Sequence, residues 1–194
     1  MDVRAQRQAE TRRRIAAATV SLHEEVGPAR TTIAEIARRA GVQRLTVYNN
    51  FPEEYDLFAA CSRHFLEAHP PPDPTAALSA DDPAGRVEGV LRGLYGWYRG
   101  NERMAANVRH DRERIPALDA VMSDTADAQA AALGEELASG FATRPSRSLR
   151  AAVAVALDFW TWRRLAREGL DDRSAARLMA ELVRVAAASR RMDS

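Results

Sequence analysis

The segment spanning residues 31–51 constrains the fold of this 194-residue chain more than any other, because its pattern predicts two short helices joined by a tight turn. Thr32 can cap the first helix, and Glu35, three residues later, completes the sequence signature of a capping box. Gly41 follows this helix, and glycine readily adopts the left-handed backbone that ends a helix. Apolar residues recur between cap and glycine at the spacing of one buried face: Ile33, Ile36, Ala37 and Ala40.

The second short helix is predicted to begin after Gln43, which takes the N-cap position. Val42 and Val47 then occupy the N′ and N4 positions, where they can form a hydrophobic staple. Val47 and Phe51, four residues apart, supply the inward face of this helix. The residues left outside this core are Arg44, Leu45, Thr46, Tyr48, Asn49 and Asn50.

The outer residues of the second helix have the chemistry that DNA recognition uses. Arginine can bind guanine edges, asparagine can bind adenine edges, hydroxyl groups can bind phosphates, and an α-helix fits the major groove. The competing interpretation is a helical hairpin whose polar face is only solvated. The agreement of cap, turn glycine and staple favours a DNA-binding helix-turn-helix. Its predicted DNA contacts are Thr32, Arg44, Leu45, Thr46, Tyr48, Asn49 and Asn50.

These residues also resemble a known family. Part of the chain is similar to the N-terminal DNA-binding domain of TetR-family transcriptional regulators. The similar segments are a helix over about residues 11–26, the run Thr-Thr-Ile-Ala-Glu-Ile-Ala-Arg-Arg-Ala-Gly-Val at 31–42, and two short motifs at 46–48 and 51–52. The resemblance covers about residues 12–60. It implies a homodimeric, all-helical repressor that a small molecule, bound in the C-terminal domain, releases from its operator.

The chain departs from the family pattern at three places. Gln43 stands where the family often has serine, and Leu45 stands where it often has glycine or another small residue. Glu53 and Glu54 stand where the family often has lysine near the start of the next helix. Two acids suit a helix N-terminus electrostatically, but they repel a DNA phosphate. The alternative function is therefore a small-molecule-binding protein of the same fold with weak or lost operator recognition.

Charge is distributed unevenly along the chain. The net charge is only +1, yet residues 1–51 carry nine arginines against five acidic residues, and residues 52–194 carry an acidic excess. Only the N-terminal part has the positive excess that attracts phosphates. Its first arginines could touch DNA or could form a solvated helix start; they are Arg4, Arg7, Arg12, Arg13 and Arg14.

The remaining chemistry of the sequence argues against several classes of protein. The single cysteine, Cys61, excludes an internal disulfide and is expected to be a small core residue, and His23 is expected at the surface. No apolar leader and no membrane-length apolar run occurs, so a cytoplasmic location is expected. The motifs of hydrolases, nucleotide-binding loops and zinc proteases are missing, so the chain is not expected to be an enzyme, and no cofactor or metal is expected.

Helical periodicity continues to the C-terminus and predicts an all-α fold. Residues 1–52 are assigned to the DNA-binding domain, with residues 1–10 polar and mobile, and residues 53–194 to a helical ligand-binding and dimerisation domain. Residues 53–69 form the linking helix of that second domain. A proline-rich surface loop follows, and further helices are expected at 82–100, 102–114, 116–137, 146–168 and from 171 onward.

The last two helices carry the proposed dimer contact. The resemblance implies that they form a four-helix bundle with a second copy, although they could instead be intramolecular core. The two recognition helices would then lie about 34–36 Å apart. The helices that enclose the ligand in the resembling family carry the predicted effector contacts, among which Asp158 interrupts an apolar helix: Trp97, Met104, Asn107, Val108, Met122, Gln129, Asp158, Phe159 and Trp162.

Overall fold

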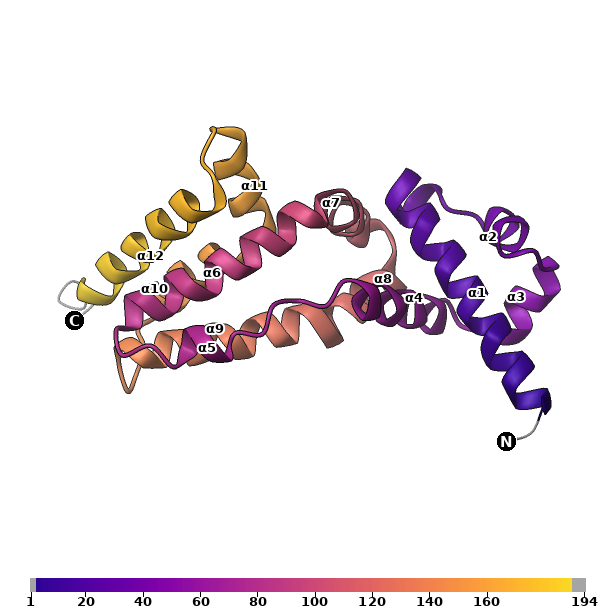
Figure 1. Cartoon of the computed structure of the whole chain (residues 1–194), viewed down its shortest axis with the longest axis horizontal. Helices are drawn as coiled ribbons and strands as arrows, with labels where there is room; N and C mark the ends of the chain where they lie inside the picture. The colour runs from indigo at the N-terminus through magenta and orange to yellow at the C-terminus, as the bar shows by residue number, and fades with distance from the viewer. Residues whose placement is uncertain (1–2, 190–194) are drawn as a thin grey trace. The chain divides into compact units, whose positions relative to one another are not determined.

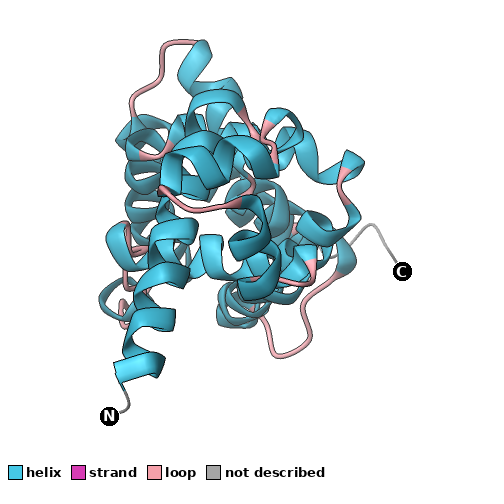
Figure 2. Ribbon diagram, turned by 90° about the vertical axis from the view of Figure 1, so that its right-hand side faces the viewer, coloured by secondary structure: helices cyan, strands magenta, loops and turns pink. Residues whose placement is uncertain are grey.

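A computed structural model describes residues 3–189, and throughout that range the chain is built from helices and loops without a strand (Figures 1 and 2). The predicted all-α fold is therefore confirmed. None of the helices in this range combines the length and the apolar character that crossing a bilayer demands. The chain divides into two compact units, the first made of the residues up to Pro70 together with Asn101–Thr125, the second of Pro71–Gly100 together with the residues from Ala126 onward.

The first unit contains the predicted helix-turn-helix and, in addition, two helices from the middle of the chain. Its elements are α1 (Val3–Val26), the 3-10 turn η1 (Pro28–Arg30), α2 (Ile33–Ala40), α3 (Arg44–Asn50), α4 (Glu54–Ala68), α7 (Glu102–Asp111), the 3-10 turn η2 (Arg112–Arg114) and α8 (Pro116–Met122). Helix α1 begins at Val3, so residues 3–10 are helical. Their predicted mobility stays a prediction, and residues 1–2, for which it was also made, lie outside the described residues. The functional boundary predicted after residue 52 stays a prediction.

The ends of α2 follow the predicted capping chemistry. Thr32 Oγ1 accepts a hydrogen bond of 3.2 Å from the Glu35 backbone N–H, and the Glu35 carboxylate pairs with Arg38 one turn further on. Gly41 adopts φ 65° and ψ 41°, the left-handed conformation that the turn requires. The N–H of Val42 then donates to the Ala37 carbonyl at 2.9 Å, which closes the helix end. The predicted Thr32 cap and Gly41 stop are therefore confirmed, whereas the Glu35 carboxylate pairs with Arg38 and does not complete the predicted capping box.

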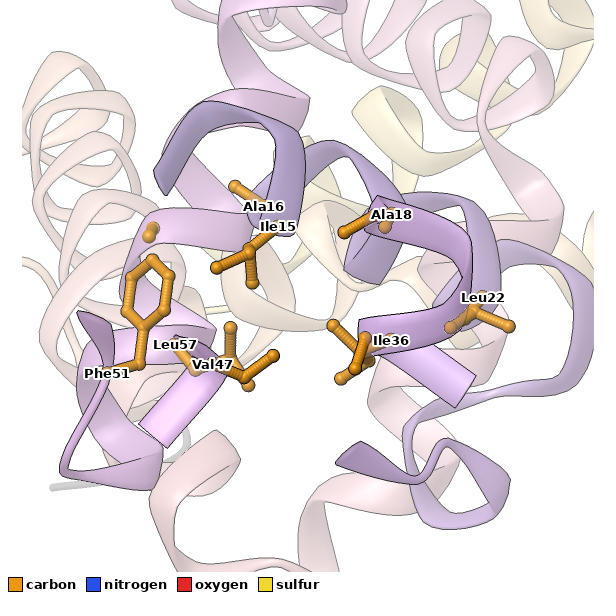
Figure 3. Packing of buried hydrophobic residues seen from close by; sticks show 11 residues of the cluster. Ile15, Ala16, Ala18, Leu22, Ile36, Val47, Phe51 and Leu57 are labelled. Atoms are coloured by element: carbon orange, nitrogen blue, oxygen red, sulfur yellow. The ribbon is translucent and has the colours of Figure 1, made fainter. Parts of the chain in front are cut away.

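One hydrophobic cluster joins α1, α2, α3 and the start of α4 (Figure 3). Ile15 of α1 and Val47 of α3 are fully buried, and Ile36 of α2 is nearly so. Val42 packs against the same cluster, as the predicted staple requires. Because side chains from four helices share one core, α3 is fixed in orientation by its inward face. The buried members are Ile15, Ala16, Ala18, Leu22, Ile36, Ala37, Ala40, Val47, Phe51, Leu57 and Ala60.

The second unit contains the rest of the helices. They are α5 (Thr75–Leu78), α6 (Pro83–Gly100), α9 (Ala128–Phe141), α10 (Arg147–Leu157), α11 (Phe159–Arg167) and α12 (Asp172–Ala188). Helix α12 packs along α6 and α10, and α9 packs against α10. Helix α5 lies inside the segment expected to be a loop, and a five-residue π-helical segment (Ser123–Asp127) interrupts the helix expected at 116–137.

The single helix predicted at 146–168 is wrong, because Asp158 divides it into α10 and α11. Asp158 has an extended backbone (φ −72°, ψ 137°), and its carboxylate accepts from the Thr161 N–H at 2.9 Å. Two tyrosines of α6 satisfy carbonyls that the break leaves free at the end of α10: Tyr95 Oη donates to Ala156 O at 2.7 Å and Tyr98 Oη to Leu157 O at 2.9 Å. Asp158 is thus an exposed helix cap and not a buried charge.

Candidate nucleic-acid interface

Helix α3 presents a continuous outer face to solvent. Arg44, Leu45, Tyr48 and Asn49 are exposed, with Leu45 at 65% and Tyr48 at 54% of their full accessible surface. Thr46 is half-buried at the side of this face. Thr32, at the start of α2, is exposed as well, although its hydroxyl already caps the helix.

Asn50 differs from the other predicted DNA-contacting residues because it is buried, with 9% of its surface exposed. Its side-chain Nδ2 donates to the Thr46 carbonyl at 2.8 Å, one turn back in α3. Its own carbonyl accepts a hydrogen bond from the guanidinium of Arg12. Asn50 therefore stabilises the end of the helix from inside, and the outer face consists of the four exposed residues and Thr46.

Arg12 and Arg14 of α1 have a role that was not predicted from the sequence, which indicated either DNA contact or a solvated helix start. The Arg12 guanidinium lies 4.1 Å from the centroid of the Phe51 ring while it donates to Asn50 O. The Arg14 guanidinium donates to the carbonyls of Ala40 and Gly41, the latter at 3.1 Å. Two arginines of the N-terminal cluster thus cap the C-terminal ends of α2 and α3, where positive charge is stabilising.

Glu53 and Glu54, the acids that depart from the family pattern, are both exposed at the start of α4. Glu53 takes the N-cap position, and Glu54 lies in the first turn. Negative charge there complements the positive end of the helix dipole. The two acids can therefore be explained by their stabilising effect on the N-terminus of α4, independently of any effect on DNA binding.

Helix α7 makes a row of polar contacts to the C-terminal end of α1. Arg103 Nη2 donates to Glu25 O at 2.8 Å, and Asn107 Nδ2 donates to His23 O at 2.9 Å and Glu24 O at 3.0 Å. Asp111 Oδ2 accepts from the N–H of Ala29 at 2.8 Å. The three residues of α7 are spaced four apart and so share one helix face. More than 75 residues separate the partners in sequence, so helical spacing did not predict this contact.

The glycine between α1 and η1 suits the same contact. Gly27 has φ 88°, a conformation that favours glycine. A Cβ atom at this position would lie 2.8 Å from Asp111 Oδ2, which is too close for a non-bonded contact. Gly27 therefore permits the turn and leaves room for the Asp111 carboxylate.

His23 is buried, with 3% of its surface exposed, so the prediction of a surface histidine is wrong. Its ring stacks on Phe58 with centroids 5.4 Å apart, and its Nδ1 lies 3.5 Å from Cys61 Sγ. Burial lowers the pKa of His23 to about 4, against a smaller opposing effect of the Asp111 carboxylate. Burial also raises the pKa of the Cys61 thiol to about 12, so this predicted core cysteine is an unreactive thiol at neutral pH.

The predicted effector contacts are distributed over both units. In the first unit, Met104 is buried, Asn107 makes the α7 contact described above, and Met122 packs with Phe58 while Val108 lies against the same cluster. The members in the second unit are the half-buried Trp97, the exposed Gln129 and Asp158, and the buried Phe159 and Trp162.

Aromatic rings gather in the second unit around two of these residues. Tyr98 lies 5.3 Å from Phe159 and 5.8 Å from Trp162, centroid to centroid. Trp162 Nε1 donates to Asp172 Oδ1 at 2.9 Å, and Asp172 also accepts two hydrogen bonds of 2.8 Å from Arg99. The Arg99 guanidinium, and to a smaller extent the Trp162 N–H, lower the pKa of the Asp172 carboxyl. Trp162 is therefore anchored at its polar edge and packed against rings on its faces.

Comparison with known proteins identifies the first part of the chain. Residues 15–61 match the family model described as bacterial regulatory proteins, tetR family. No curated protein matches the chain. The match confirms the resemblance predicted from the residues of the helix-turn-helix.

Solved structures extend the likeness to the whole fold. One is a TetR-like transcriptional regulator from Rhodococcus sp. RHA1, with 18% identity, a TM-score of 0.59 and coverage of 92% of this chain and 96% of that one. A second is a TetR-family regulator from Syntrophomonas wolfei, with 14% identity, a TM-score of 0.64 and coverage of 96% and 99%. A third is RolR in complex with resorcinol, with 23% identity, a TM-score of 0.54 and 98% coverage of both chains. The chain therefore has the fold of these regulators.

We expect stability to depend on pH through His23. Its pKa is near 4 in the folded protein and near 6.5 in the unfolded chain, so the unfolded chain binds the proton more readily. The free energy of unfolding should therefore fall as the pH drops from about 6.5 to about 4, by up to about 3 kcal/mol. Urea titrations at several pH values measure this. His23→Gln, which cannot ionise, should flatten the dependence relative to wild type, and the same slope in both proteins would contradict the assignment.

Proposed function

Residues 15–61 form an N-terminal domain of the TetR family of bacterial regulatory proteins, and from that premise we propose that this protein is a sequence-specific transcriptional repressor. One observation carries the proposal: a capped helix-turn-helix whose second helix is fixed by a shared core and turns Arg44, Tyr48 and Asn49 outward. Side chains of these types bind guanine edges, phosphates and adenine edges. A cytoplasmic location goes with this function.

The DNA-binding residues that we propose are those still exposed or half-exposed around α3. They are Thr32, Arg44, Leu45, Thr46, Tyr48 and Asn49. The Asn50 side chain is buried and donates to the Thr46 carbonyl, so it is left out of this set. The alternative is a binding protein that has lost operator recognition. The exposed Leu45 and the exposed acids Glu53 and Glu54 favour it, although the two acids also stabilise the N-terminus of α4.

Dimerisation through the two helical segments predicted at the C-terminus, which correspond to α10–α11 and α12, is the second part of the proposal. Helix α12 exposes Leu178, Leu182 and Val185, which lie on one face at the spacing i, i+4 and i+7. Val155 of α10 is also exposed, at 52%. Exposed apolar side chains on α10 and α12 fit a self-complementary surface of a two-fold dimer.

A small-molecule effector is the third part. RolR, which shares this fold, was solved with resorcinol, a small aromatic ligand. Phe159 and Trp162 are aromatic residues of the second unit that are suited to such a ligand. Trp97, which precedes Tyr98 in the chain, is half-buried and is proposed as a further contact. The further effector contacts proposed are Met104, Asn107, Val108, Met122, Gln129 and Asp158.

Helix α7 supplies the route by which an effector would act on DNA binding. It follows α6 directly in the chain. Its Arg103 and Asn107 donate to carbonyls at the end of α1, and its Asp111 accepts from the following turn η1. Helix α1 in turn shares its core with α2 and α3. An effector that favours a displaced α6 would move α7, then α1, and the recognition helices would cease to match successive major grooves.

Replacing Arg44 or Tyr48 by alanine should weaken binding to the operator by about tenfold or more, because one base or phosphate contact is lost per subunit while the core is untouched. Fluorescence anisotropy with DNA fragments selected by the wild-type protein measures the affinity. Arg92→Ala, which removes an exposed arginine of α6 outside the proposed DNA and dimer surfaces, is the charge-matched control and should bind like wild type. Equal affinities for Arg44→Ala and Arg92→Ala would contradict the proposed interface, and failure of the wild-type protein to select any DNA would favour the alternative function.

Leu182→Glu should convert the dimer to a monomer, because a two-fold axis brings the same surface of both copies together and would bury like charges. Sedimentation equilibrium gives the mass directly. Ala132→Glu, on the exposed face of α9, introduces the same charge elsewhere and should leave the dimer intact. A dimeric Leu182→Glu protein would place the interface on another surface.

Asp111→Ala should loosen the turn after α1, because the Ala29 N–H loses its acceptor. Amide hydrogen exchange of residues 27–31 should become faster, and the response of DNA affinity to an effector should weaken. His110→Ala, the exposed neighbour on α7, is the matched control. The proposed route fails if the two variants exchange at the same rate in this segment.

A further inference from the structure

Leu45 is the most exposed large hydrophobic side chain among the described residues, at 65% of its full surface. A lone exposed leucine is ordinary on a protein surface. This one, however, lies on the helix that the proposed function inserts into DNA, in a row with the exposed Tyr48 and Asn49. The chemistry of the DNA that α3 would contact should therefore explain why an exposed leucine lies at this position.

The geometry of α3 directs Leu45 straight away from the protein. Val47 marks the core-facing direction because it is fully buried. At 3.6 residues per turn, Leu45 and Asn49 each lie roughly 160° around the helix from Val47. These two residues form the outermost ridge, with Tyr48 on one side and Thr46 on the other. A groove that receives α3 meets this ridge first.

Leucine can neither donate nor accept a hydrogen bond, so it cannot read the polar groups of a base edge. The apolar group that base pairs display in the major groove is the 5-methyl of thymine. We propose that Leu45 packs against a thymine 5-methyl group in each half of the operator and makes DNA affinity depend on that methyl. This inference rests on the proposed function, and it adds the base that this residue selects.

Asn49 limits where the thymine lies. It follows Leu45 by one helical turn, which is about 6 Å along the axis. Base pairs stack about 3.4 Å apart, so the two side chains span about two base-pair steps. Asparagine binds the N6 and N7 edge of adenine. The operator half-site should therefore contain a thymine at one base pair and an adenine at another base pair about two steps away.

Replacing thymine by deoxyuridine removes only the 5-methyl group, so it tests the proposal directly. The operator is first obtained by selecting random duplexes with the full-length wild-type protein, and each thymine is then replaced in turn. Each half-site should contain one sensitive thymine. Replacing it in one half-site should weaken wild-type binding by about fourfold, and replacing it in both should weaken binding by about fifteenfold. Other thymines serve as internal controls.

The protein variants decide whether Leu45 is responsible. Leu45→Ala should bind the thymine operator more weakly than wild type and should no longer distinguish thymine from deoxyuridine at the sensitive position. Leu45→Met keeps an apolar side chain and should keep most of the discrimination. The inference is overturned if Leu45→Ala retains the full methyl dependence, if no thymine is sensitive, or if Leu45→Ala changes the oligomeric state of the free protein. A wild-type protein that selects no DNA would remove the proposed function itself, and with it this inference.

Discussion

The common core of α1, α2 and α3 is the interaction on which the account of this protein depends. Ile15, Ile36 and Val47 come from three different helices and are almost completely buried. Helix α3 has only seven residues, which is too short to be stable alone in water, so its shape and direction come from this packing. Arg12 and Arg14 reinforce it at the two helix ends. A rigid base of this kind is what allows a few exposed side chains to be presented in a fixed register.

Helix α1 packs against α2 and α3 on one side and is contacted by α7 near its C-terminal end. Helix α7 contacts the C-terminal end of α1 through Asn107 and the following turn η1 through Asp111, while the middle of α1 contributes to the core shared with α2 and α3. At this end of α1, the buried His23 is neutral and stacks on Phe58. A rearrangement that disrupts this packing would therefore cost free energy. A contact made of backbone carbonyls and one carboxylate is directional, so a small displacement of α7 would break it.

Local patterns in the sequence were sufficient for the helix-turn-helix. The cap at Thr32, the left-handed Gly41 and the inward Val47 each depend on residues within one or two turns. Contacts between distant residues could not be predicted in this way. Arg12 and Asn50 are 38 residues apart, and Ala29 and Asp111 are 82 apart, so burial of Asn50 and the role of α7 appear only in three dimensions. At Asp158 the apolar pattern was continuous on both sides, and the competing preference of aspartate for a helix N-cap decided the break.

The central claim is that α3 of each subunit lies in the major groove of DNA. Protection of guanine N7 from dimethyl sulfate reports contact in that groove alone, because N7 faces the major groove. We expect the full-length protein to protect two clusters of guanines, about one helical turn (10–10.5 base pairs) or a multiple of it apart. Binding that leaves guanine N7 fully reactive, or that protects only a single cluster, would contradict it.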